Sequence, residues 1–221
     1  MIIDNVAALR NAVNQEQVTI VAVTKTQSVE RIREAVSAGL TVLGENRVQE
    51  AAEKIPVLKD LSVEWHLIGH LQTNKVKQAV ALFSLIQSVD SIKLATEIDR
   101  QARLAGKIQD ILLQINVAGE ESKFGIDSAD AVSITSQLET LPNIRLCGLM
   151  TIAPFFAQAE QTRPIFRQTR QLFDQLKKTV AKPECFCWLS MGMTHDYAVA
   201  IEEGANMIRV GSGIFGERTT R

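Results

Sequence analysis

The chain has 221 residues, with 24 Lys and Arg against 25 Asp and Glu, so its formal net charge is −1. Nucleic-acid affinity comes mainly from clustered cations that neutralise phosphates, and this charge balance therefore argues against a nucleic-acid-binding protein. Hydrophobic residues make up 46% of the chain and charged residues 22%, which excludes disorder as its main state. Only 5% of the residues are aromatic, so the apolar residues are mostly aliphatic, as is typical of a parallel sheet.

The N-terminal residues 1–17 do not have the pattern of a signal peptide, because Asp4 and Arg10 interrupt the apolar residues and no cleavage-like site follows. No apolar run approaches the roughly 20 residues that a membrane-spanning helix needs. Cysteines occur three times, at Cys147, Cys185 and Cys187, without the spacing of a disulfide scaffold, so we expect reduced, buried thiols. These features predict a cytoplasmic protein without membrane contact.

Apolar segments of strand length recur eight times along the chain, at residues 18–24, 40–44, 63–69, 84–89, 110–117, 145–151, 185–190 and 207–211. The segments between them have helical spacing, and a further helix is expected over about 3–15, ahead of the first strand. This alternation of strand and helix predicts a parallel sheet. Eight repeats in roughly 200 residues predict an α/β protein with a single (β/α)8 TIM barrel domain over residues 1–221. An open, doubly wound sheet is the alternative.

A lysine directly follows the first predicted strand, which is where (β/α)8 barrels place their chemistry. Alternation puts Lys25 on the same face as Val21 and Val23, which can be the barrel interior. A partly desolvated lysine near another cation has a lowered pKa, and a neutral amine is the nucleophile that forms a Schiff base with a carbonyl. The alternative is a lysine whose ammonium group reaches solvent from the end of the strand.

Glycine- and hydroxyl-containing segments follow the seventh and eighth predicted strands, at residues 190–194 (Ser-Met-Gly-Met-Thr) and 211–213 (Gly-Ser-Gly). Barrels commonly bind phosphate on backbone N–H groups between these two loops, and the Ser190 and Ser212 hydroxyls can add donors. A Schiff-base lysine and a phosphate site at one barrel mouth predict a phosphorylated aldehyde, of which pyridoxal 5′-phosphate is the most common. Arg209 is placed to face the pyridine nitrogen, and an ion pair with Glu217 is its alternative role.

Taken together, these residues resemble the pyridoxal phosphate homeostasis proteins, single-domain relatives of the fold-type III barrel domain of alanine racemase. The matching segments lie in order along nearly the whole chain: 21–25, 44–50, 65–75, 121–126, 148–152, 189–197 and 208–218. The resemblance implies that Lys25 carries the cofactor as a Schiff base and that Arg209 faces the pyridine nitrogen. It also implies the other cofactor contacts: the phosphate ligands Ser190, Gly192, Gly211 and Ser212, the ring contact Asn46, and the lesser contacts Met150, Met191 and Met193.

Other motifs are weaker. His66 and His70 have a spacing that would suit zinc on a helix, but they fall on a strand end and a loop without further ligands, so we expect no metal site. Lys123 could meet a second aldehyde or be solvated, and loop positions favour solvation. Trp65 and Trp188 are expected to pack between barrel and helices.

Three functions compete. The first is a pyridoxal phosphate-binding protein without robust turnover that acts in intracellular homeostasis of the cofactor, with pyridoxal phosphate-dependent apoenzymes as candidate partners and a monomer as the expected state. The second is an amino-acid racemase of the alanine racemase lineage, for which the only tyrosine, Tyr197, looks badly placed, and for which no second domain is expected after the last strand. The third is a class I aldolase, which is weakened because no acid/base carboxylate stands beside Lys25.

Overall fold

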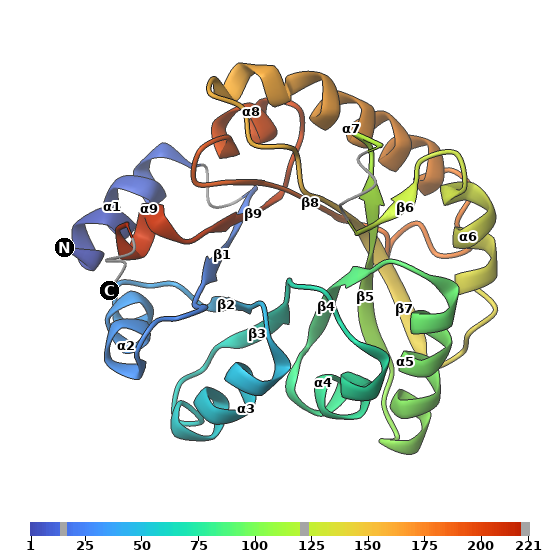
Figure 1. Cartoon of the computed structure of the whole chain (residues 1–221), viewed down its shortest axis with the longest axis horizontal. Coiled ribbons are helices and arrows are strands. Elements are labelled where there is room, and N and C mark those ends of the chain that lie inside the picture. The colour runs from blue at the N-terminus through green and yellow to red at the C-terminus, as the bar shows by residue number, and fades with distance from the viewer. Residues whose placement is uncertain (14–16, 120–123, 218–221) are drawn as a thin grey trace.

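The eight long strands form a closed parallel barrel surrounded by helices (Figure 1). The computed structural model describes residues 1–13, 17–119 and 124–217. The barrel strands are β1 (Thr19–Val23), β2 (Val42–Glu45), β3 (Glu64–Leu67), β4 (Leu85–Val89), β5 (Gln109–Asn116), β7 (Ile144–Thr151), β8 (Trp188–Met193) and β9 (Met207–Val210). Because β4 pairs with β5 and β9 pairs with β1, the sheet closes on itself, which confirms the predicted (β/α)8 barrel and excludes the open sheet.

The helices lie outside the ring of strands (Figure 1). They are α1 (Ile2–Ala12), α2 (Val29–Ser37), α3 (Val48–Val57), α4 (Val76–Leu82), α5 (Ile92–Leu104), α6 (Ala131–Leu138), α7 (Arg163–Lys177), α8 (Tyr197–Glu202) and α9 (Ser212–Phe215), with 3-10 turns η1 (Thr73–Lys75) and η2 (Ala159–Thr162). A short strand, β6 (Ile126–Asp127), pairs with the end of β5. None of these helices has the length and apolar character needed to cross a membrane, within the part of the chain that the structure describes.

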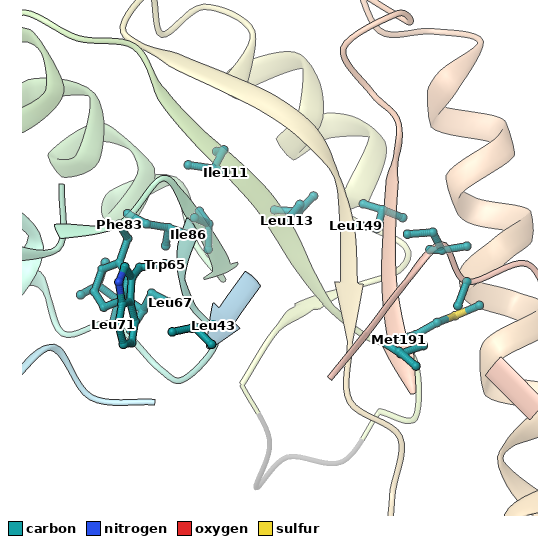
Figure 2. Packing of buried hydrophobic residues seen from close by; sticks show 14 of the residues in the cluster. Leu43, Trp65, Leu67, Leu71, Phe83, Ile86, Ile111, Leu113, Leu149 and Met191 are labelled. Carbon is teal, nitrogen blue, oxygen red and sulfur yellow. The ribbon is translucent and has the colours of Figure 1, made fainter. Parts of the chain in front are cut away.

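Alternation along the strands separates two layers of buried side chains. The larger layer packs between strands and helices, and Figure 2 shows part of it, from Leu43 and Trp65 across to Leu149 and Met191. The smaller layer fills the barrel interior and includes Val21, Ile68, Leu85, Leu112, Cys147, Met150 and Met207. Thr24 and Lys25, at the end of β1, therefore belong to opposite sides of the barrel wall.

Strand β8 begins later than the sequence suggested. The prediction covered residues 185–190, whereas β8 runs from Trp188 to Met193, and Cys185 and Cys187 precede it. The Asn206 amide caps this start, because its Oδ1 accepts from the Leu189 N–H at 2.7 Å and its Nδ2 donates to the Cys187 carbonyl at 2.6 Å. Local apolar character cannot reveal such a cap.

The structure also corrects the expectations for one tryptophan and two cysteines. Trp65 packs between strands and helices as expected, but Trp188 packs against the interior cluster instead. Among the three cysteines, all of which are free thiols, only Cys147 is buried, while Cys185 and Cys187 are half-buried. Burial raises the pKa of the Cys147 thiol to about 12, so this cysteine is held in its unreactive protonated form.

Candidate functional site

A cavity of about 560 Å³ opens at the C-terminal ends of β1, β8 and β9. This volume lies in the usual range for small-molecule and cofactor sites. Its lining brings together five of the predicted site residues, Lys25, Met193, Arg209, Gly211 and Ser212, with six others: Val23, Gln27, Thr194, His195, Gly216 and Glu217. Thus the predicted lysine, arginine and glycine–serine loop do converge on one place at the barrel mouth.

Lys25 reaches the cavity because β1 ends two residues before it. The strand pairs in register with β9, where Val21 lies opposite Arg209, and the chain then turns at Lys25 and Thr26. Thr26 has a φ of 64°, which is rare for a β-branched residue. Lys25 is half-buried and lines the cavity.

Arg209 is 3% exposed and lies in the barrel interior on β9. Its Nη1 donates to the Ser190 hydroxyl at 2.6 Å and its Nη2 donates to the Thr151 carbonyl at 2.8 Å. Burial lowers the pKa of the guanidinium to about 10, although the negative charge of Asp196 opposes this. Among the described residues, no carboxylate lies within ion-pair distance of the Arg209 guanidinium. The alternative role of Arg209, an ion pair with Glu217, is therefore not seen. A buried cation without a paired anion suits a site that receives an anionic ligand.

Ser190 lies inside strand β8 and does not line the cavity. Its hydroxyl donates to Gln87 Oε1 at 2.6 Å and accepts from Arg209, which can only donate. The other side of the Gln87 amide contacts His66 Nδ1 at 3.0 Å and the sulfur of Met207 at 3.2 Å. The hydroxyl proton of Ser190 is therefore directed away from the cavity, and Ser190 orients Arg209 in this structure.

Thr194 is the hydroxyl residue that the sequence analysis left out of the site. The backbone N–H groups of Gly211 and Gly213 donate to its Oγ1, at 3.4 and 3.2 Å, across the cavity wall. The signal was available, because Ser190, Gly192 and Thr194 alternate along one face and Thr194 is the nearest of them to the barrel mouth. Because Thr194 Oγ1 accepts from both amides, these N–H groups and the hydroxyl lie together on the cavity wall, and the hydroxyl proton can be donated to a phosphate.

The other predicted contacts on β8 and β7 do not all lie in the cavity. Gly192 has a φ of 91°, and a Cβ there would lie 2.6 Å from the Ala200 Cβ, so this position requires glycine. Met193 lines the cavity, whereas Met191 is buried between strands and helices, as Figure 2 shows. Met150 is fully buried in the interior cluster beneath the mouth.

Asn46 lies apart from the Lys25 cavity. It lines a neighbouring cavity of about 530 Å³ together with Gly69, His70 and Lys75, and its Oδ1 is buried without a hydrogen-bond partner. His70 stacks on Phe124 with ring centroids 3.8 Å apart. The described part of the chain contains no group of three or more His, Cys, Asp or Glu side chains that could hold a metal ion. Lys123 lies outside the described residues.

Comparison with known proteins adds independent evidence. The family model of the alanine racemase N-terminal domain matches residues 1–219. A pyridoxal phosphate homeostasis protein of Aquifex aeolicus (strain VF5) is 46% identical over 201 residues, which are 90% of this chain and 86% of that protein. Another with this name, from Pasteurella multocida (strain Pm70), is 41% identical over 207 residues, 92% of this chain and 88% of that protein.

Among solved structures, PipY of Synechococcus elongatus PCC7942 superposes with a TM-score of 0.91 at 40% identity, covering 98% of this chain and 100% of PipY. A second PipY structure, described as having pyridoxal phosphate bound, has a TM-score of 0.90 at 39% identity and the same coverage. Alanine racemase of Clostridium difficile 630 has a TM-score of 0.78 at 17% identity and is covered over 56% of its length. At that identity the likeness concerns the barrel fold alone.

Proposed function

Because the chain belongs to the pyridoxal phosphate homeostasis protein family and contains the alanine racemase N-terminal domain, we propose that it binds pyridoxal 5′-phosphate at the barrel mouth. The observation that carries this proposal is the convergence of Lys25, the buried Arg209 and the Thr194–Gly211 donors on one cavity. An amine, a buried cation and a cluster of amide donors together suit an anionic, phosphorylated aldehyde.

Each group has its own task. When bound, pyridoxal phosphate supplies an aldehyde that condenses with an amine, and Lys25 is the amine that lines this cavity. Arg209 remains positively charged at neutral pH and donates toward the pyridine nitrogen, which it cannot protonate. Gly211, Ser212 and Thr194 hold the phosphate through hydrogen bonds.

The other predicted contacts remain part of the proposal with altered tasks. Ser190 acts through Arg209, Met193 lines the cavity wall, and Gly192 and Met191 fix the backbone of β8. Met150 supports the floor below the ring. Asn46 would reach the ring only from the neighbouring cavity, in which its unpartnered oxygen is available to accept a hydrogen bond.

We propose binding of the cofactor, and through it pyridoxal phosphate homeostasis, as the function. Support comes from the names of the curated relatives, which describe homeostasis proteins rather than enzymes. The alanine racemase structures are 16–17% identical to this chain and share its fold alone, so they do not favour the racemase alternative. We further propose that residues 1–221 form one domain, which acts as a cytoplasmic monomer with pyridoxal phosphate-dependent apoenzymes as partners. Sedimentation of the loaded and unloaded protein tests the monomer.

The decisive experiment locates the covalent linkage. The protein is loaded with pyridoxal phosphate, reduced with borohydride and mapped by mass spectrometry. We expect one pyridoxyl group on Lys25 and none in Lys25→Ala, whose folding is checked by circular dichroism. Lys75→Ala, which changes a lysine of the neighbouring cavity, is the matched control and should retain the adduct. An adduct on Lys75 or Lys123 in the unmutated chain would overturn the assignment.

A further inference from the structure

A cluster of three charged side chains lies behind the backbone that carries Lys25, with Glu45 and Lys54 buried and Glu50 half-buried. Lys54 is 8% exposed and Glu45 is 0% exposed, although charged residues are rarely buried to this extent. The Lys54 ammonium donates to Glu45 Oε1 at 2.8 Å, to Glu50 Oε1 at 2.6 Å and to the Thr24 carbonyl at 2.7 Å. These three bonds use all three donors of the ammonium.

The cluster forms hydrogen bonds with the residues on both sides of Lys25. On the N-terminal side, the Thr24 carbonyl accepts from Lys54 and the Thr24 hydroxyl donates to Glu45 Oε1 at 2.7 Å. On the C-terminal side, the Thr26 N–H donates to Glu50 Oε1 at 2.5 Å. Because Thr26 has a φ of 64°, its backbone is in a conformation that a β-branched residue adopts only under constraint.

None of the three charged side chains lines the Lys25 cavity. Thr24 and Glu45 follow the outward-facing positions Ala22 and Leu43 on their strands, while Lys25 follows the inward-facing Val21 and Val23. The cluster is therefore on the helix side of the barrel wall, where α3 supplies Glu50 and Lys54. Any influence on Lys25 passes through the backbone.

We propose that Glu50 and Lys54 are positioning residues that hold the Thr24–Thr26 backbone so that the Lys25 amine is fixed toward the cavity. Stability alone is a weak reason for such a cluster, because replacing a buried ion pair by apolar residues is often neutral or stabilising. The second oxygen of Glu45 is also left without a hydrogen-bond partner, an energetic cost that a purely structural cluster would avoid.

This inference rests on the proposed function, in which Lys25 bears the cofactor. Its amine adds to the aldehyde carbon, and the carbonyl oxygen leaves as water when the C=N bond forms. Reaction requires the nitrogen to approach the carbon in a narrow range of positions, whereas the phosphate and ring are held by other residues. Misplacing Lys25 should thus slow the covalent step and leave non-covalent recognition intact.

The test compares pyridoxal phosphate with pyridoxine 5′-phosphate, which carries an alcohol in place of the aldehyde. In Glu50→Ala, we expect covalent loading of Lys25 to be slower by about tenfold or more, with affinity for pyridoxine phosphate changed by less than about twofold. Glu50→Gln keeps an acceptor for the Thr26 N–H and should recover most of the loading rate. Glu53→Ala removes an exposed carboxylate from the same helix and should behave like the unmutated chain.

Lys54→Met is the second variant, because it removes the bond to the Thr24 carbonyl with a side chain of similar length. Like Glu50→Ala, it should slow covalent loading by pyridoxal phosphate and leave the affinity for pyridoxine phosphate nearly unchanged. Equal weakening of both ligands would show that the cluster acts on the whole cavity and not on Lys25, and would overturn the positioning role. Unchanged loading in both variants would also overturn it. An adduct on a lysine other than Lys25 in the unmutated chain would instead contradict the proposed cofactor site. Mapping the adduct therefore distinguishes failure of the proposed site from failure of the positioning role.

Discussion

The hydroxyl of Ser190 accepts a 2.6 Å hydrogen bond from Nη1 of Arg209 inside the barrel. Since its own proton goes to Gln87 Oε1, Ser190 has no donor left for a phosphate in this arrangement. Arg209 depends on this contact and on the Thr151 carbonyl for its orientation. Ser190 therefore holds the guanidinium of Arg209 in this structure, whereas the sequence analysis expected it to bind the phosphate.

Replacing Ser190 tests this separation. Ser190→Ala leaves Arg209 with one fewer acceptor, so we expect weaker binding of pyridoxal phosphate and of unphosphorylated pyridoxal by a similar factor, about tenfold for a hydrogen bond to a charged group. Dissociation constants from absorbance titration of both ligands provide the measurement. A loss confined to the phosphorylated ligand would restore Ser190 as a phosphate ligand.

Replacing Thr194 should weaken binding of the phosphorylated ligand and leave binding of pyridoxal nearly unchanged. Thr194→Val keeps the shape of the side chain but removes the hydroxyl that meets the Gly211 and Gly213 amides. Loss of one hydrogen bond to a charged phosphate costs about 1.5–3 kcal/mol, so affinity for pyridoxal phosphate should fall by about tenfold or more. Affinity for pyridoxal should change little in the same titration. Thr194→Ser, which retains the hydroxyl, is the matched control.

Glu45 and Glu50 share the Lys54 ammonium, but their pKa values move in opposite directions. Burial raises the pKa of Glu45 above its ordinary 4.5, despite hydrogen bonds from Lys54 and Thr24. Burial also acts on Glu50, but hydrogen bonds from Lys54 and the Thr26 amide outweigh it and lower the pKa. The stability contributed by Glu45 is therefore full below pH 4.5 and is lost as pH rises through its native pKa, whereas that of Glu50 is lost as pH falls below 4.5.

Urea unfolding as a function of pH measures these contributions. We expect Glu45→Gln to flatten the fall in unfolding free energy just above pH 4.5, and Glu50→Gln to flatten the fall below it. Glu53→Gln, on the exposed side of α3, should follow the unmutated chain. Glu45→Gln and Glu50→Gln profiles that bend in the same direction would contradict the opposite pKa shifts.

Much of the fold could be predicted, because strand and helix periodicities alternate along the chain and eight repeats are enough to close a barrel. The convergence of Lys25, Arg209 and Gly211 followed from placing each at the C-terminal end of a strand. What could not be predicted was the orientation of individual hydroxyls. Ser190 and Thr194 lie on the same face of β8, and nothing in the sequence shows that Ser190 donates to Gln87 while Thr194 lines the cavity.

The contacts among Glu45, Glu50 and Lys54 could not be predicted from the sequence either. Glu45 and Glu50 lie in a segment that matches the family, yet nothing local indicates that Lys54, nine residues after Glu45, is buried against both. Helix α3 brings Glu50 and Lys54 onto one face through their i, i+4 spacing. Only the packing of that helix over β1 and β2 shows that the face points at the Thr24 carbonyl.

Racemisation needs one base on each face of the α-carbon, and Lys25 can serve one face. Tyr197 begins α8 and packs against the cluster between strands and helices, and it does not line the Lys25 cavity. Arg209 cannot protonate the pyridine nitrogen, so the ring would stabilise a carbanion only weakly.

We therefore expect negligible racemisation. The loaded protein is incubated with L-alanine in deuterated water, and α-proton exchange and D-alanine are followed by NMR and chiral chromatography. Exchange should stay far below an ordinary enzymatic rate of about 1 per second. His195, an exposed side chain on the cavity wall, is the group to examine if exchange is seen, and His195→Asn would show whether it supplies the second base. Turnover at an enzymatic rate that His195→Asn abolishes would replace cofactor binding alone with racemase activity as the function.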